Sequence, residues 1–251
     1  MLIIMVENIV SKDERLQRRE RQSGRRISEQ RAERQRPRRE FKRPKRIVIK
    51  KEKTKFNIKL FGRWDSNVNV NDLGLRPYIN LEPRLLPRSA GVNRGRFHKS
   101  RVHIVERLAL HLMVPGHTGK RHRLTSGTFA GGFINCLSAV ERALELIEKK
   151  ENKNPIEVLV RAIENAAVRE EIISYQLGSI MAREAVITAP QRRIDKTLRY
   201  FAQGAYKKSF HSKKGIEHAL AEEILAAYHD SQDSMAMRER DRIEREAAGA
   251  R

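Results

Sequence analysis

Apolar residues recur at helical spacing through most of the chain after residue 101. Positions i, i+3 or i+4, and i+7 share one face of a helix, so such stripes predict helices that each bury one face. The first three stripes consist of Val105, Leu108 and Leu112, then Leu137, Val140, Leu144 and Ile147, then Ile156, Leu159, Ile163 and Ala166. Two further stripes consist of Ile194, Leu198, Phe201 and Ala205, then Ile216, Leu220 and Ile224. A last helical pattern, 232–246, is highly charged with little apolar face, and we expect it to pack on a partner or to lie exposed.

The helical period fails between Arg169 and Ala189. Two runs rich in β-branched and aromatic residues flank Gly178-Ser179, and Pro190 ends the second run. This pattern predicts a β-hairpin at about 169–189. Each strand of about eight residues spans roughly 25 Å, far enough to project beyond a helical body. The expected fold class is therefore mainly α, a bundle of about six helices with a protruding β-hairpin.

The N-terminal part of the chain lacks helical stripes. Apolar and polar residues alternate around Ile58 and around Val68, which predicts short extended segments, and Pro83 and Pro87 keep the next stretch irregular. We therefore expect three parts: a basic arm at 1–55, an extended or irregular region at 56–101, and a helical domain at 102–251.

The charge of the chain indicates a negatively charged binding partner. The 251 residues include 53 Lys and Arg against 31 Asp and Glu, a net charge of +22. Residues 11–55 alone hold 20 basic and 7 acidic side chains, a net of +13, and have too little apolar surface to offset the entropy of folding. This arm is either a solvated linker or, as the abundance of Arg favours, a segment that orders on RNA phosphates. For the whole chain, nucleic acid is the expected polyanionic partner, and a membrane surface is the second option. A basic soluble domain that has no such partner is the remaining alternative.

Cysteine content and the N-terminus bear on the compartment. Cys136 is the only cysteine, which excludes an internal disulfide and a cysteine-based zinc site and suits the reducing cytoplasm. Residues 1–10 are apolar but too short to span a bilayer, so no membrane partner is expected. Met5 is an alternative start to Met1.

No motif of an enzyme or cofactor site is present. The chain has no GxSxG, HExxH or phosphate-cradling P-loop sequence. Five histidines cluster in sequence, but their basic neighbourhood disfavours a metal cation; they are His98, His103, His111, His117 and His122. Cys136 is interpreted as a small core residue rather than a nucleophile. We expect a protein that is not an enzyme and has no cofactor.

Basic residues at three places are candidate RNA contacts. Lys120, Arg121 and Arg123 lie in the glycine-rich loop 115–132, where a flexible backbone can approach phosphates. Arg192 and Arg193 stand at a predicted helix start, which also favours anions. Lys207 and Lys208 lie near the end of the same helix, where pairing with the helix dipole is an equal alternative. Of the aromatic residues Trp64, Tyr78 and Phe97, which offer bases a stacking surface, Phe97 is the best candidate because it lies between Arg96 and His98.

Several motifs resemble the small-subunit ribosomal protein seven family. They are PIEVLVRAIENAA at 155–167, the glycine-tipped hairpin, PQRR at 190–193, GKR at 119–121 and ALAEEILAA at 219–227. LFGRW at 60–64 and YINL at 78–81 resemble its archaeal and eukaryotic branch. The resemblance covers roughly 56–246. Ser179 stands where the family often has a second glycine, and Ala182 and Glu184 stand where larger or apolar residues are usual.

This resemblance implies a structural component of the small ribosomal subunit. It would bind the 3′ major (head) domain of the small-subunit rRNA, organise head assembly, and place its hairpin near the mRNA path and the exit-site tRNA, as a monomer among neighbouring ribosomal proteins. The expected rRNA face comprises Arg96, Lys99, Arg101, Lys120, Arg121, Arg123, Arg192, Arg193, Lys207 and Lys208. The expected hairpin tip comprises Gly178, Ser179 and Arg183. The competing hypothesis is a free nucleic-acid-binding translational regulator.

Overall fold

The fold is described from a computed structural model of the whole chain, at residues 58–89, 95, 97–116 and 132–250. Contacts divide the chain into two units, residues 1–54 and 55–251, and every described residue belongs to the second. The basic arm at 11–55 thus lies outside the described residues.

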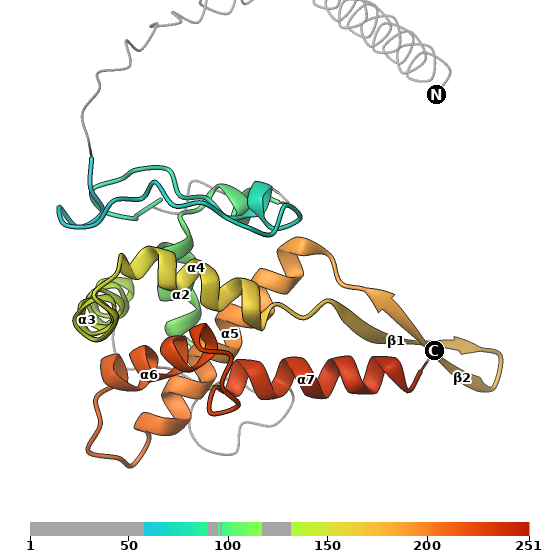
Figure 1. Cartoon of the computed structure of the whole chain (residues 1–251). Helices are drawn as coiled ribbons and strands as arrows, with labels where there is room; N and C mark the ends of the chain where they lie inside the picture. The colour runs from blue at the N-terminus through green and yellow to red at the C-terminus, as the bar shows by residue number, and fades with distance from the viewer. Residues whose placement is uncertain (1–57, 90–94, 96, 117–131, 251) are drawn as a thin grey trace, which may run out of the picture. The chain divides into compact units, whose positions relative to one another are not determined.

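Six α-helices and one β-hairpin make up the described part of the chain (Figure 1), which confirms the expected fold class. The helices are α2 (Ile104–Leu112), α3 (Phe133–Glu151), α4 (Pro155–Ala166), α5 (Pro190–Ser209), α6 (Ile216–Tyr228) and α7 (Met235–Ala248). The strands are β1 (Glu170–Leu177) and β2 (Ile180–Ile187), and two short 3₁₀ helices are η1 (Arg76–Tyr78) and η2 (His98–Arg101).

Helix α6 lies at the centre of the bundle, in contact with α3, α4 and α5. Ala219, Leu220 and Ile224 of this helix are buried, together with the apolar stripes of its neighbours. Cys136 of α3 belongs to the same core, and burial raises the pKa of its thiol. Its interpretation as a core residue is confirmed.

Local sequence explains where α4 begins. The side chain of Asn154 accepts a hydrogen bond from the Ile156 N–H at 3.1 Å, and Pro155 occupies the first helical position. A side-chain cap satisfies one of the free amides of a helix start, and proline there gives up no intrahelical bond. Both residues therefore favour the observed start over any later one.

The hairpin forms where the sequence predicts it, around Gly178-Ser179. Leu177 pairs with Ile180 across the two-residue turn, and pairing continues to Glu170 and Ile187 at the base. Gly178 has φ +60°, whereas Ser179 is not among the residues with positive φ. That combination is typical of a type II′ turn, which requires glycine only at the first central position. Ser179 therefore suits this turn without a second glycine.

The part of the chain at 58–89 packs against the helices rather than forming a separate layer. Leu60, Trp64, Leu75 and Ile79 are buried in the same core as the helical stripes. The alternating pattern forms no regular strand among residues 58–89, where only isolated bridges occur. Burial of these large side chains and hydrogen bonds to the helices, such as that from the Asn71 N–H to Glu164, hold this region in place instead of sheet pairing.

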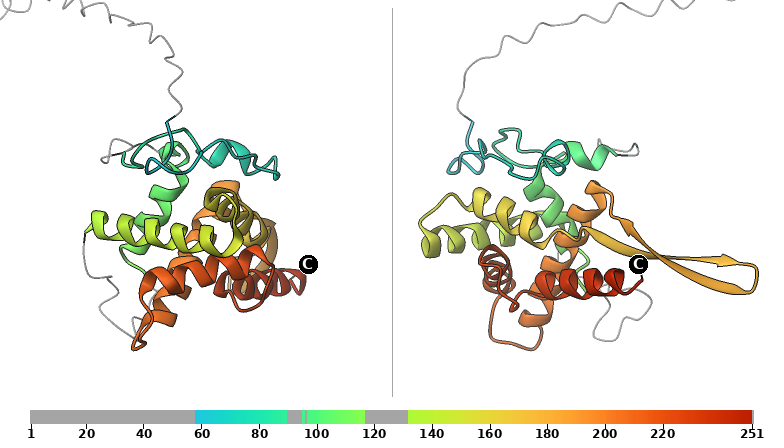
Figure 2. Two further views of the ribbon diagram at one scale, coloured as in Figure 1. Left: turned by 60° about the vertical axis from the view of Figure 1, so that its left-hand side comes forward. Right: turned by 45° about the vertical axis from the view of Figure 1, so that its right-hand side comes forward.

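The expectation for the last helix was wrong. Helix α7 buries Ala236, Met237, Ile243 and Ala247 within this chain, and it contacts α5 and both strands. In Figure 2 it runs along the base of the hairpin, whose far end extends past the helices. Small alanine side chains supply half of this buried face, which explains why its apolar pattern is weak.

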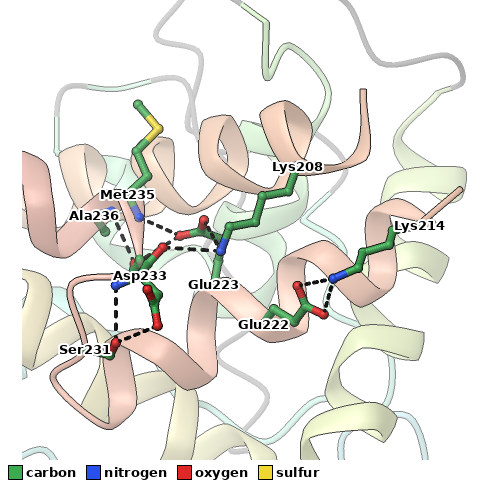
Figure 3. Close-up of polar contacts among 9 residues, drawn as sticks. Lys208, Lys214, Glu222, Glu223, Ser231, Asp233, Met235 and Ala236 are labelled. Carbon is green, nitrogen blue, oxygen red and sulfur yellow. Dashed lines mark hydrogen bonds and ion pairs between the residues drawn. The ribbon is translucent and has the colours of Figure 1, made fainter. Parts of the chain in front are cut away.

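One buried carboxylate fixes the start of α7 (Figure 3). Glu223 of α6 is fully buried; its Oε2 accepts hydrogen bonds from the Met235 N–H at 2.8 Å and the Ser234 hydroxyl at 3.0 Å. Lys208 Nζ of α5 lies 2.9 Å from the other oxygen. A charged group taken out of water requires such partners, so this cluster ties α5, α6 and α7 together. Among the described residues, no helix combines the length and apolar character needed to cross a membrane.

Candidate nucleic-acid interface

An open groove lies where the segment before α2 meets the first half of α5. Its volume is about 460 Å³. Its lining residues are Gly95, Phe97, Lys99, Ala189, Gln191, Arg192, Asp195, Lys196 and Arg199. The fold thus brings together three residues singled out from the sequence, Phe97, Lys99 and Arg192, across almost a hundred residues of chain.

Sequence reasoning missed two cations of this groove. Arg192, Lys196 and Arg199 follow the i, i+4, i+7 spacing of one helix face. That spacing was available in the sequence as a signal. Among the described residues, Arg199 has no carboxylate within ion-pair distance, and its side chain is exposed.

Glu171 at the base of β1 holds two of these cations. Arg192 Nε and Nη2 donate to its two carboxylate oxygens at 2.6 and 3.0 Å, and Lys196 also donates to it. Burial opposes ionisation of Glu171, but the hydrogen bonds from Arg192 and Lys196 outweigh it and lower the pKa of the carboxyl. The Arg192 side chain is 59% exposed, whereas the Glu171 side chain is 15% exposed and keeps Lys196 as a second partner. Arg192 is therefore accessible to a phosphate from the solvent side.

Asp195 forms the floor of the groove and is held from three sides. Lys99 Nζ lies 3.4 Å, Arg107 Nη2 2.9 Å and His111 Nε2 3.7 Å from its carboxylate. Burial alone raises the pKa of Asp195, but hydrogen bonds from His111 and Arg107 and the charges of Arg107 and Lys99 hold it well below its ordinary value. Arg107 is 3% exposed and also donates to the Tyr78 carbonyl at 2.9 Å, so this pair joins α2, α5 and the N-terminal region. Lys99 is 67% exposed and remains accessible to a ligand.

Phe97 stands at the mouth of the groove in an uncommon backbone conformation. Its φ is +64° and its side chain is 59% exposed. By contrast, Trp64 is 3% exposed and donates to Glu148, and Tyr78 packs against the core. Of the three aromatic candidates, only Phe97 is exposed to this extent.

Arg101 lies in a second basic pocket. This pocket has a volume of about 600 Å³ and is lined by Pro77, Ile79, Asn80, Glu82, Arg84, Arg88, Ser89, Ser100 and Arg101. Arg84 is paired with Glu82 at 2.9 Å, while Arg88 and Arg101 are exposed. The candidate basic surface thus includes part of the N-terminal region.

Other candidate residues have partners within the chain. Arg193 Nε donates to the Thr188 carbonyl at 2.9 Å and is only partly exposed, and Lys208 is bound to Glu223. Lys207 is exposed near the end of α5. Arg96, Lys120, Arg121 and Arg123 lie outside the described residues. Whether any of these contacts RNA stays a prediction.

The hairpin differs in charge from the rest of the chain. Its strands carry Glu170, Glu171 and Glu184 against one cation, Arg183, which is exposed on β2. Leu177 and Ile180 beside the Gly178-Ser179 turn are 62% and 69% exposed. The hairpin therefore adds little to phosphate attraction.

Of the five histidines that cluster in the sequence, His117 and His122 lie outside the described residues, and the other three occupy unrelated places. His98 accepts a hydrogen bond from the Gly95 N–H, and His111 lies near Asp195. His103 is buried and accepts from the Val105 N–H at the start of α2; burial and the charge of Arg84 lower its pKa to about 4. Within the described ranges, no three His, Cys, Asp or Glu side chains are grouped as metal ligands.

A helical body with a basic, aromatic-edged groove defines a class, the basic helical RNA-binding proteins. A family model described as "Ribosomal protein S7p/S5e" matches residues 75–251. The chain is 45% identical over 196 residues to "Small ribosomal subunit protein uS7" of Nanoarchaeum equitans (strain Kin4-M), which covers 77% of this chain and 99% of that protein. It is 40% identical over 197 residues to the protein of the same name from Methanothrix thermoacetophila, over 77% of this chain and 100% of that protein.

The chain therefore belongs to the ribosomal protein S7p/S5e family, and its similar relatives are archaeal. Members of this family are structural ribosomal proteins, which confirms the expectation that the chain is not an enzyme. The resemblance noted in the sequence motifs is thereby confirmed.

Proposed function

We propose that this protein is a structural component of the small ribosomal subunit in the cytoplasm and that it binds the head domain of the small-subunit rRNA. In this role the helical body docks on folded rRNA and organises assembly of the head. The relatives from Nanoarchaeum and Methanothrix, named as small ribosomal subunit proteins, support the assignment to that subunit. The observation that supports the rRNA-binding surface is the groove that joins Phe97 and Lys99 to the basic face of α5.

The charge distribution supports different roles for the cationic segments and for the hairpin. Cations concentrate on the groove, on the second pocket and on the arm at 11–55. Binding to phosphates releases condensed counterions, so these segments supply affinity that falls steeply with salt. The acidic and apolar hairpin is instead suited to lie beside the mRNA path and the exit-site tRNA without clamping their phosphates.

Binding to isolated RNA tests this proposal. The full chain is titrated with a head-domain rRNA fragment and with an unrelated folded RNA of equal length, at several salt concentrations. We expect clear preference for the head fragment and a steep salt dependence. Equal affinity for both RNAs contradicts head-specific binding.

A free translational regulator is the alternative function. Such a protein binds a short mRNA hairpin tightly and sediments apart from ribosomal subunits at physiological salt. The structural role predicts that the protein stays with the small subunit through a high-salt wash. Sedimentation of washed subunits, with the protein detected in each fraction, separates the two functions.

A further inference from the structure

We propose that the groove beside α5 holds one unstacked nucleotide of the rRNA, with its base against Phe97 and its flanking phosphates between Lys99 and Arg199. This inference rests on the proposed function, because it names how the bound RNA is read at that site. It predicts that the protein recognises an unpaired position rather than only a helical backbone.

The groove has suitable dimensions and lining for a nucleotide. Its volume of about 460 Å³ lies inside the range of roughly 300 to 1,000 Å³ found for small-molecule sites. Its lining includes the aromatic ring of Phe97 together with guanidinium and ammonium groups. Bases inside a duplex have both faces covered by neighbours, so an exposed aromatic ring is suited to a base in a loop, bulge or end.

The backbone before α2 is built to present Phe97. A bulky residue with φ +64° is disfavoured, and such conformations persist where the surroundings hold them, often at binding sites. Here the His98 ring accepts the Gly95 N–H at 2.9 Å, and a Cβ on Gly95 would lie 2.7 Å from that ring. A side chain at position 95 would therefore displace the His98 ring and its hydrogen bond in this loop, in which Phe97 is 59% exposed.

The cations around Phe97 divide into structural and available groups. Arg107 is buried on Asp195 and serves the fold. Lys99 Nζ lies 3.4 Å from Asp195, which is a long contact, and the Lys99 side chain is 67% exposed. Arg199 is exposed and has no ion pair among the described residues. Lys99 lies in η2 and Arg199 in α5, so each of the two elements that line the groove offers one cation to the phosphates that flank a stacked base.

Measurements of RNA affinity at several salt concentrations separate the contribution of base stacking from that of charge. Replacing an ionic contact lowers the slope of log affinity against log salt, whereas removing a stacked ring lowers affinity at every salt concentration. The test uses the full chain with Phe97→Ala, Phe97→Trp and Arg199→Gln. Leu73→Ala, which removes a 77% exposed side chain outside the groove, is the matched control.

We expect Phe97→Ala to weaken binding of the head-domain fragment roughly 10-fold or more with an unchanged salt slope. Arg199→Gln should reduce the slope by about 0.7 to 0.9. Phe97→Trp should retain affinity, and its indole fluorescence should be quenched by the fragment, with the wild-type chain and its buried Trp64 as the baseline. Leu73→Ala should bind like the wild type.

Two outcomes overturn the inference while leaving the proposed function intact. Wild-type affinity of Phe97→Ala, with head preference preserved, means that no base stacks there. Normal RNA binding by these variants combined with loss of a neighbouring subunit protein assigns the groove to a protein partner. If the wild-type chain itself lacks preference for the head fragment, the proposed function fails instead. Circular dichroism of each variant separates loss of binding from loss of folding.

Discussion

Glu223 and Gly204 show how one missing side chain permits a buried charge. A Cβ on Gly204 would lie 2.6 to 2.9 Å from the carboxylate of Glu223, which is fixed by Ser234, Met235 and Lys208. Alanine is normally favoured over glycine inside a helix by roughly 0.8 to 1 kcal/mol. We nevertheless expect Gly204→Ala to lower the free energy of unfolding by roughly 1 to 3 kcal/mol, because the carboxylate must move.

A double-mutant cycle provides the control for this prediction. Glu223→Ala removes the carboxylate and should itself cost roughly 2 to 3 kcal/mol through lost charge-assisted hydrogen bonds. In that background Gly204→Ala should be neutral or stabilising, as measured by urea denaturation. Equal costs of Gly204→Ala in both backgrounds would show that the clash is not with Glu223.

We expect Asp195 to contribute to the free energy of unfolding in a way that depends on pH. Its pKa in the folded protein is lower than the ordinary 3.8, so folding favours the ionised form. The contribution is complete above the unfolded-state pKa and is lost as pH falls through the lower folded-state value. Asp195→Asn should therefore cost roughly 3 kcal/mol at neutral pH, and the difference from wild type should shrink below about pH 4.

Denaturant titrations at successive pH values measure this difference. Asp230→Asn is the matched control, because its carboxylate is 67% exposed and lies 3.5 Å from Arg240. Surface pairs of this kind are worth roughly 0 to 1 kcal/mol. A pH-independent gap between wild type and Asp195→Asn would be inconsistent with the described ion pairs.

Among the elements, the hairpin is separable from the rest of the interface. Removing Gln176, Leu177, Ile180 and Met181 deletes two cross-strand pairs and leaves Tyr175 opposite Ala182 beside the Gly178-Ser179 turn. The four removed residues are exposed. Hydrogen-bonded and non-hydrogen-bonded residue pairs alternate along an antiparallel ladder, so removal of two pairs leaves the same type of pair next to the turn. We expect folding and affinity for the head fragment to stay within about twofold, since no phosphate-pairing cation is lost.

The shortened hairpin should affect only what lies at its tip. Small subunits reconstituted with it should show weaker retention of exit-site tRNA or altered crosslinking to mRNA, whereas wild-type subunits serve as reference. Unchanged tRNA and mRNA contacts would count against the proposed place of Gly178, Ser179 and Arg183.

In the whole molecule, charge is split between an arm and a body. Residues 11–55 carry +13, while residues 56–251 carry 33 basic and 23 acidic side chains, a net of +10. In the described part of residues 56–251, cations line a groove. Deleting residues 11–55 should therefore lower affinity and the salt slope but keep the preference for the head fragment.

Salt titrations of the truncated and full chains test this division. A chain with the arm residues in shuffled order is the control, and it should restore both affinity and slope. Lost preference in the truncated chain, or failure of the shuffled arm, would mean that the arm reads RNA shape or sequence.

The sequence by itself determined the six helices, the hairpin and the α4 start at Asn154-Pro155. These features follow from interactions among residues close in the chain, since helix periodicity, capping and turn geometry are local. Only the tertiary structure decided that Arg199 and Phe97 line the same groove, that Lys208 pairs with buried Glu223, and that α7 packs on its own chain. Those contacts join residues 15 to about 100 positions apart, where the arrangement of whole helices decides which charges meet. Local pattern identifies which side chains are available, whereas packing decides which are buried as partners and which remain exposed to bind RNA.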